Sequence, residues 1–451
     1  MSWFSKLFRQ RIDAQEPLDL DPLSVIPPAP KVIAGGRPRR LPRFRGSAVD
    51  QVRTDMRGAD RTRLRLRSAF TPSRPIMDAA MFAGRAKVLT QLIRAIEDQQ
   101  MHAVIFGPRG IGKTSTLHVL CGIAREARYL VRYISCGERT EFSELFRAIL
   151  QDIPLLFHDA YDPTSAEIEE GLTFADVVPA GELSVAVVSD LLNRLSGTRM
   201  LIVLDEFDRA HSADFRRAIA ELIKNLSDRN ARVQIVIAGV ANNLVEIIEH
   251  IPSIRRNIAG LQLPNMSEEE VIELITNGET ASGMVFEKEA QRLISTLALG
   301  LPYLTSLIAQ HAGLMALDRD ATLVTRGDVL LAIDAAIEEL KLRISPASRH
   351  QIDRAHADGH AEVLGTLALA AIQHGGRVPK DTVKGAVPQI GSVDVFLREL
   401  DRSYQLLAPI PDDPEGAYSF RDDGTPILLW LSFTHEKRQK SRVEPLPDAA
   451  A

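Results

Sequence analysis

Short apolar runs alternate with amphipathic segments through the middle of the chain. Between the runs, apolar residues recur at helical spacing, for example at Leu89, Leu92, Ile93 and Ile96. Strands of a parallel sheet are apolar throughout because helices cover both faces. The pattern therefore predicts an α/β core over residues 75–264. Its five candidate strands cover residues 102–106, 129–134, 200–204, 233–238 and 260–263.

The strand pattern stops after Pro264. Ser267 and Glu270 form a capping-box start, so a helix is predicted there. We expect a small helical lid over residues 265–345. Its helices are predicted at residues 267–276, 286–299, 303–317 and 326–340.

A third pattern covers residues 352–434. Two helices precede a third near residues 392–404, and two short apolar runs then flank a turn at residues 412–416. Three helices and a hairpin are the outline of a winged helix. The polar tail, residues 435–451, is predicted to be disordered.

The first 74 residues form a basic, Pro/Arg-rich arm that is predicted to be largely disordered. They hold 16 Lys/Arg and 7 Asp/Glu, a net charge of +9, whereas the whole chain has −5. The partner of the arm could be nucleic acid, anionic lipid or the acidic body of the chain. Residues 1–11 could form an amphipathic helix that touches a membrane weakly or docks on a partner.

Composition narrows the protein class. No apolar run approaches the roughly 18 residues that cross a bilayer. The two cysteines lack metal or redox spacing, which favours reduced thiols and a cytoplasmic protein.

One glycine-rich motif follows the first strand and precedes a helix. It fits G-x-x-x-x-G-K-[ST], the pattern of a phosphate-binding loop. Glycines let backbone N–H groups turn toward phosphate oxygens, and the following helix N-terminus favours negative charge. We expect Lys113 to reach the β- and γ-phosphates of ATP and Thr114 to bind Mg²⁺. The predicted cofactor-binding residues are Gly107, Pro108, Arg109, Gly110, Ile111, Gly112, Lys113, Thr114 and Ser115.

The third strand ends in two acids, Asp205 and Glu206. A parallel strand places this end at the same sheet edge as the phosphate loop. Asp205 is expected to hold Mg²⁺ and Glu206 to act as general base toward water. Asp208 lies nearby, but an N-cap role is favoured for it.

Three further residues are catalytic candidates. Asn242, after the fourth strand, could orient the attacking water or merely cap a helix. Arg255 and Arg256 precede the fifth strand. Either could reach the γ-phosphate of a neighbouring subunit or remain at the solvated surface.

These motifs resemble the AAA+ superfamily, and more narrowly its initiator (origin-recognition-like) and STAND-type clade. The resemblance covers residues 70–345, and the winged helix extends it to 433. Phe82-Ala-Gly-Arg85 is similar to the segment that packs on adenine. Gly239-Val-Ala-Asn242 and Ser253-Ile-Arg-Arg256 are similar to the sensor and arginine-finger segments. The resemblance implies Phe82 and Arg85 at the cofactor, and assembly into homo-oligomers.

The lid departs from the initiator pattern. Its Gly300-Leu-Pro-Tyr303 segment resembles the STAND-type form, with Tyr303 near the cofactor and no arginine for the γ-phosphate. This favours slow hydrolysis and a nucleotide-controlled switch over a motor.

The charge of the winged helix is unfavourable for DNA. Residues 352–434 contain 7 Lys/Arg and 12 Asp/Glu, and the hairpin tip is acidic. A protein partner or internal docking is therefore favoured there. A replication, plasmid or transposition ATPase that binds DNA is one alternative function, and a membrane-surface scaffold with weak ATPase activity is another.

Overall fold

A computed structural model describes residues 58–443, apart from 78, 179–180, 242–243, 245–246, 248–251, 387–391 and 411–412. All of them belong to the unit Arg45–Ala451. Predictions for residues 1–57 and 444–451, including a membrane contact through residues 1–11, lie outside the described residues.

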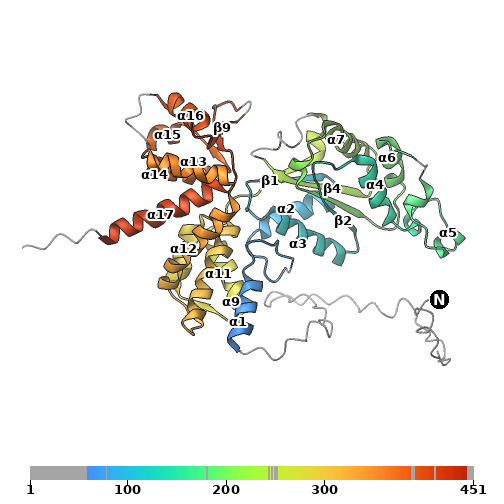
Figure 1. Cartoon of the computed structure of the whole chain (residues 1–451). Coiled ribbons are helices and arrows are strands. Elements are labelled where there is room, and N and C mark those ends of the chain that lie inside the picture. Colours follow the sequence, from blue (N-terminus) through green and yellow to red (C-terminus); the bar gives the residue numbers. More distant parts are fainter. Residues whose placement is uncertain are drawn as a thin grey trace, which may run out of the picture. The chain divides into compact units, whose positions relative to one another are not determined.

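The predicted α/β core is confirmed. Its five strands pair in parallel in the order β2-β3-β4-β1-β5, and Figure 1 shows their arrangement. The registers Ser135↔Asp205 and Gly107↔Val240 align the carboxyl ends of neighbouring strands. The strands are β1 (His102–Gly107), β2 (Leu130–Ser135), β3 (Met200–Asp205), β4 (Val233–Val240) and β5 (Ile258–Gln262).

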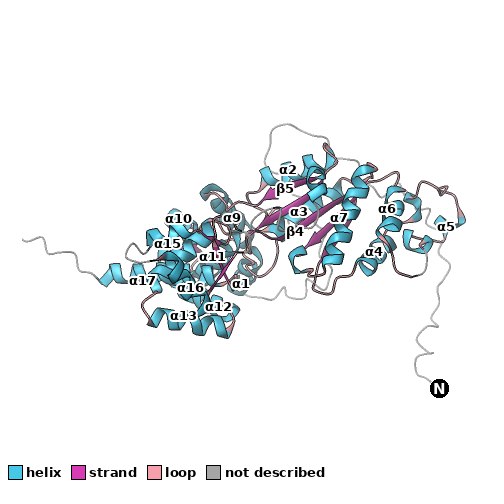
Figure 2. Ribbon diagram, turned by 90° about the horizontal axis from the view of Figure 1, so that it is seen from above, coloured by secondary structure: helices cyan, strands magenta, loops and turns pink. Residues whose placement is uncertain are grey.

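Successive residues of a strand point to opposite faces of the sheet, so each buried strand feeds two cores. Ala103 and Ile105 of β1 pack in one core with helices α2 and α3, whereas Val104 and Phe106 pack with α4, α6 and α7 in the other. The strands therefore lie among helices (Figure 2). The helices are α2 (Ala86–Glu97), α3 (Lys113–Glu126), α4 (Phe142–Gln151), α6 (Val185–Asn193) and α7 (Ala213–Asp228).

Short elements connect this core. The acidic segment 159–182 contains two of them. The short elements are η3 (Leu155–Phe157), α5 (Ala166–Glu169), η4 (Phe174–Val177), η5 (Phe207–Arg209) and η6 (Pro252–Asn257).

The lid is helical, with one addition. Strands β6 (Val285–Phe286) and β7 (Leu323–Val324) pair in parallel, so the second lid helix begins at Lys288 rather than at the expected residue 286. Ser267 caps the first lid helix through the predicted box with Glu270. The lid helices are α9 (Glu268–Ser282), α10 (Lys288–Ala298), α11 (Pro302–Asp318) and α12 (Arg326–Arg343).

The end of the basic arm differs from expectation. Residues 58–69 form helix α1 (Gly58–Ala69), which packs on α9 and α11. Leu66 and Phe70 are fully buried, and the Phe70 ring contacts the Phe286 ring edge-on. The expectation of disorder is therefore wrong for this stretch. Leu66 and Phe70 are i and i+4 on one helical face, and burying them outweighs the arginine-rich composition.

The C-terminal region contains the elements of the winged-helix prediction. A strand before the third helix joins the predicted hairpin in an antiparallel sheet of order β8-β10-β9. The helices are α13 (Pro346–Ala357), α14 (Ala361–Gln373), α15 (Lys380–Ala386), α16 (Val393–Arg402) and α17 (Thr425–Val443). The strands are β8 (Arg377–Val378), β9 (Leu407–Pro409) and β10 (Tyr418–Phe420).

Helix α17 corrects the predicted tail. It continues to Val443, so residues 435–443 are helical rather than disordered. Leu428 and Leu431 bury its first turns, and His435 lies 3.3 Å from Asp334 of α12. The packed first turns stabilise the helix, and the polar residues that follow continue it, although their sequence alone does not predict a helix. Over the described residues, no helix has the length and apolarity that a membrane crossing needs.

Candidate functional site

The predicted phosphate loop connects β1 to α3 at the carboxyl edge of the sheet. Gly110 and Gly112 have φ angles of 78° and 98°. A residue with a side chain would be strained at such angles, so glycine is favoured at both positions. The loop thereby curls over the N-terminus of α3, where unpaired N–H groups and the helix dipole favour an anion. Ser115, in the first turn of α3, accepts a hydrogen bond of 3.0 Å from the Ile76 N–H.

Lys113 closes the loop on itself. Its Nζ donates to the carbonyl oxygens of Gly107 and Pro108, both at 2.9 Å. The side chain is buried, and this burial lowers its pKa to about 8, although the carboxylates of Asp208 and Asp205 act in the opposite direction. The lysine is therefore held at the place where phosphate oxygens are expected.

Asp205 and Thr114 meet, as the motifs predict. Thr114 Oγ1 donates to Asp205 Oδ2 at 2.8 Å. The same oxygen accepts a hydrogen bond of 2.6 Å from the Tyr133 hydroxyl, and Oδ1 accepts the Glu206 N–H at 2.8 Å. Only 2% of Asp205 is exposed, so these donors take the place of solvent around the carboxylate.

Glu206 directly follows Asp205, and its backbone has a left-handed conformation with φ of 53°. Its Oε2 accepts hydrogen bonds of 2.9 Å from Ser135 Oγ and from Arg209 Nη1. Ser135 lies at the end of β2 and pairs with Asp205 in register. The predicted general base is therefore tied to two neighbours in this conformation.

Arg85 is buried and contacts the backbone of the phosphate loop. Its guanidinium donates to the carbonyl oxygens of Ile111, at 3.2 Å, and Pro264, at 2.5 Å. Burial lowers its pKa, opposed by the carboxylate of Glu270. Phe82 is partly buried against the same core. Arg85 thus supports the loop through its backbone, and a contact between Arg85 and the cofactor stays a prediction.

The lid segment that carries Tyr303 lies against the phosphate loop. A Cβ on Gly110 would lie 3.3 Å from Tyr303 Cβ, and one on Gly112 would lie 3.7 Å from Pro302 Cγ. Tyr303 is partly buried, and its hydroxyl has no hydrogen-bond partner within the described chain. Arg343 of α12 lies 5.4 Å from the centre of its ring. The structure thus places Tyr303 against the loop, and its contact with the cofactor stays a prediction.

Of the remaining candidates that the structure describes, the two arginines lie away from this edge. Asn242 lies outside the described residues. Arg255 and Arg256 are exposed in η6, which precedes the first residue of β5. Because β5 runs parallel to β1, this position is at the amino edge of the sheet, opposite the phosphate loop. Asp208 is no N-cap of α7: Ser212 has that role, and Asp208 Oδ1 accepts the Val240 N–H at 2.9 Å.

Residues far along the chain complete the surroundings. Asp423, between β10 and α17, lies 3.8 Å from Arg109 of the phosphate loop. Packing around the Asp423 carboxylate raises its pKa, opposed by Arg109, and Lys113 is also close enough to act on it. The C-terminal region therefore brings a carboxylate beside the loop.

Sequence reasoning missed Tyr133, Ser135 and Asp423. A signal existed for the first two, since a strand beside Asp205 with polar residues at alternate positions near its end presents them at one edge. No comparable signal exists for Asp423, which is distant in sequence and follows a hairpin.

The donor set fits a magnesium–nucleotide complex. Carboxylate and hydroxyl oxygens, here Asp205 and Thr114, are the ligands that Mg²⁺ takes. The curled loop and Lys113 supply donors for phosphate. The sheet order, the loop after β1 and the acids after β3 define a P-loop nucleoside triphosphatase of the AAA+ type.

The chain belongs to the family described as Novel STAND NTPase 1, whose model matches residues 69–317. Among curated proteins, no sequence matches it significantly.

Several solved structures are similar over most of the chain. Cdc6p from Pyrobaculum aerophilum shares 15% identity over 83% of this chain and 98% of its own, with a TM-score of 0.42. Aeropyrum pernix Orc1, solved in complex with DNA, shares 18% identity over 84% and 98%, with a TM-score of 0.42. A Walker-type ATPase of Pyrococcus abyssi shares 15% over 80% and 99%, with a TM-score of 0.48. Such identities carry no information about ligands or partners of this chain.

Proposed function

We propose that this protein is a nucleotide-controlled switch that binds ATP with Mg²⁺ and hydrolyses the ATP slowly. The observation that carries the proposal is the contact of Thr114 with Asp205 directly beside the curled phosphate loop. A metal ligand that follows β1 and one that ends β3 meet where the phosphates of a nucleotide would end.

Nucleotide binding begins with an exchange of partners at Lys113. The phosphate oxygens replace the carbonyl oxygens of Gly107 and Pro108 as acceptors for its Nζ. Thr114 and Asp205 would hold Mg²⁺, which neutralises charge on the β- and γ-phosphates. Asp205 remains oriented by Tyr133 and by the Glu206 N–H during this exchange.

Hydrolysis is slow because Glu206 must first leave its partners. A general base has to contact the attacking water, but Ser135 and Arg209 both donate to the same Glu206 oxygen. The lid segment Gly300-Leu-Pro-Tyr303 brings Tyr303 rather than an arginine to the loop, so this segment supplies no cation to the γ-phosphate.

The Arg109–Asp423 contact supports a switch. Phosphates at the loop add negative charge close to the Asp423 carboxylate. Binding of the nucleotide and docking of the C-terminal region on the loop therefore oppose each other. The C-terminal region would then be free to meet a protein partner when nucleotide is bound. The position of Arg255 and Arg256, away from the loop of their own chain, supports a role toward a neighbouring subunit and hence a homo-oligomer. Two free, buried cysteines suit a cytoplasmic protein.

Two substitutions test the proposal in the full-length chain. Lys113→Ala should lower ATP affinity by about 100-fold, because it removes a charged donor to phosphate. Glu206→Gln should leave ATP affinity within a few-fold and lower turnover by about 100-fold or more. Fluorescent-nucleotide titration measures ATP affinity, and phosphate release measures turnover. Glu221→Gln, at an exposed position of α7, is the control. Undiminished affinity in Lys113→Ala would refute the proposal.

Assembly needs its own experiment. Size-exclusion chromatography with light scattering should show a larger particle with a non-hydrolysable ATP analogue than with ADP. Arg255→Ala and Arg256→Ala should each keep ATP affinity, and the one that acts in trans should lose turnover. A single mass in both nucleotides would exclude nucleotide-driven assembly. Duplex DNA in the same runs tests the DNA-binding alternative.

A further inference from the structure

The lid segment that reaches the phosphate loop leaves helix α10 through a sharp bend. Leu299 and Gly300 both have left-handed backbones, with φ of 50° and 75°. A Cβ on Gly300 would lie 2.3 Å from the Met266 carbonyl oxygen, so glycine is required there. Helix α11 then begins at Pro302, and its second residue is Tyr303. The place of Tyr303 therefore depends on the shape of this bend.

Four consecutive carbonyl oxygens of the bend, those of residues 297–300, each accept a hydrogen bond. Main-chain donors serve two of them, since the Leu301 N–H contacts the Ala298 oxygen and the Met266 N–H contacts the Gly300 oxygen, both at 2.8 Å. Side chains serve the other two. The last carbonyls of a helix have no partner inside it, so donors from elsewhere must satisfy them when they are buried.

The first side-chain donor is Trp430 of α17. Its Nε1 donates to the Leu297 carbonyl oxygen at 2.9 Å. An indole N–H can only donate, and a carbonyl oxygen is such a partner. Leu297 has no exposed surface, so water does not readily take the place of the indole. The C-terminal region thus completes the end of a lid helix.

The second side-chain donor is Asn265, in the linker between β5 and α9. Its Nδ2 donates to the carbonyl oxygen of Leu299 at 3.1 Å and to that of Ile372, in α14, at 3.3 Å. Two carbonyl oxygens that face one carboxamide require its NH₂ end. This one side chain therefore ties the bend both to the linker and to the C-terminal region.

From these contacts we infer that Trp430 and Asn265 are positioning residues of the nucleotide site. They hold the bend so that Tyr303 lies against the phosphate loop, and they act through the bend rather than on the nucleotide. If the bend changes shape, fewer molecules are ready to bind, and the apparent affinity falls with that fraction. The inference rests on the proposed ATP site and on the predicted contact of Tyr303 with the cofactor.

Trp430 and Asp423 lie close in sequence but have opposite expected effects. The Asp423 carboxylate lies beside Arg109 and opposes the phosphates, so its removal strengthens ATP binding. The Trp430 N–H supports the lid segment, so its removal weakens ATP binding. Loss of C-terminal contacts in general would not give two opposite signs.

Two substitutions in the full-length protein test the inference by fluorescent-nucleotide titration. Trp430→Phe keeps an aromatic ring and loses the donor, so ATP affinity should fall about threefold. Asn265→Leu loses the donor to two carbonyl oxygens and should lower ATP affinity about tenfold. Tyr303→Ala should also weaken ATP binding. In the Tyr303→Ala protein, each of the other two changes should cost less than about twofold, because both act through Tyr303.

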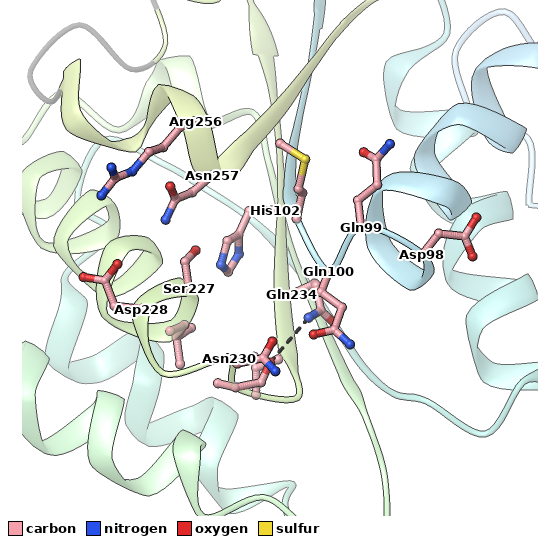
Figure 3. A pocket seen from close by; sticks show the side chains of 14 residues that line it. Asp98, Gln99, Gln100, His102, Ser227, Asp228, Asn230, Gln234, Arg256 and Asn257 are labelled. Carbon is pink, nitrogen blue, oxygen red and sulfur yellow. Dashed lines mark hydrogen bonds between the residues drawn. The ribbon is translucent and has the colours of Figure 1, made fainter.

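Each substitution has a matched control. Thr296→Ala removes a hydrogen bond of 2.9 Å to the Arg292 carbonyl oxygen on the exposed side of α10, next to Leu297. Gln99→Leu repeats the loss of a carboxamide at an exposed residue that lines a polar cavity of about 570 Å³ at the opposite edge of the sheet (Figure 3). Both controls should keep the ATP affinity of the unchanged protein.

The outcomes separate this inference from the proposed function. Unchanged ATP affinity in folded Trp430→Phe, or losses that add fully to that of Tyr303→Ala, would overturn the inference. Thermal unfolding shows which variants are folded, and the conservative Trp430→Phe decides if Asn265→Leu is not. ATP binding that depends on Lys113 but not on Trp430 would refute the inference alone, whereas ATP binding that survives Lys113→Ala would refute the proposed function.

Discussion

At the scale of single residues, the phosphate site is held by groups that change partner when a nucleotide binds. Lys113 rests on two backbone carbonyls, and Asp205 gathers donors from Thr114, Tyr133 and the main chain. The site is therefore organised before any ligand is present, which lowers the cost of ordering it on binding.

The lowered pKa of Lys113 has a consequence for pH. Phosphate favours the charged lysine, so it raises this pKa and nucleotide binding takes up a proton wherever the free lysine is neutral. The affinity for ATP should therefore be highest below about pH 7, where Lys113 is charged, and should fall as the pH rises through about 8. At pH 8.5 a lysine with a pKa of about 8 lacks roughly 0.8 proton, so calorimetry in buffers of different ionisation enthalpy should detect an uptake of about that size. A pH-independent affinity from 7 to 9.5 would contradict the shift.

Tyr133 tests whether orientation of Asp205 matters. Tyr133→Phe removes a hydrogen bond of 2.6 Å to a buried carboxylate, and such bonds contribute about 1.5–3 kcal/mol. We expect the apparent Mg²⁺ affinity in the presence of ATP to fall about tenfold, while metal-free nucleotide binding changes little. Tyr129→Phe is the matched control, since that hydroxyl contacts Glu97 at 3.3 Å. Equal Mg²⁺ titrations for both variants would argue against a positioning role.

At the scale of elements, helix α1 is part of the lid. The Phe70 ring, directly after α1, lies against Gly278 of α9, and a Cβ there would overlap it. Gly278→Ala should therefore expel the ring and destabilise the lid by about 1–3 kcal/mol. Thermal unfolding should begin roughly 3–8 °C lower, and trypsin should cut near the arginines of α1 sooner.

Gly122 of α3 provides the matched comparison. It is also helical, but a Cβ there meets no atom within 4 Å. Gly122→Ala should thus raise stability by up to about 1 kcal/mol, because alanine is the better helix former. If Gly278→Ala were as stable as Gly122→Ala, α1 would not be docked in solution.

At the scale of the whole molecule, the Arg109–Asp423 contact couples the C-terminal region to the phosphate loop. Both side chains are at least half-exposed, so the energy involved is limited to about 1 kcal/mol. Asp423→Asn should raise ATP affinity about threefold to fivefold at low salt, and the gain should shrink as salt is added. Asp394→Asn, which breaks the exposed pair with Lys380, is the control and should leave ATP affinity unchanged. No difference between the two variants would mean that nucleotide and docking are independent.

Sequence alone determined the α/β core, because its apolar strands and the phosphate loop depend on local pattern. It also predicted that Lys113, Thr114 and Asp205 share one sheet edge, since parallel strands end together. It misjudged residues 58–69 and 435–443, where packing of Leu66, Phe70 and Leu428 outweighs a polar composition.

Tertiary structure alone decided what surrounds the phosphate loop. Glu206 is held in place because Ser135 and Arg209 both donate to its Oε2. The contact of Arg109 with Asp423 joins residues that are far apart in the chain. Such groupings arise from which strands and helices become neighbours, and that choice depends on long-range packing that no local pattern of residues encodes.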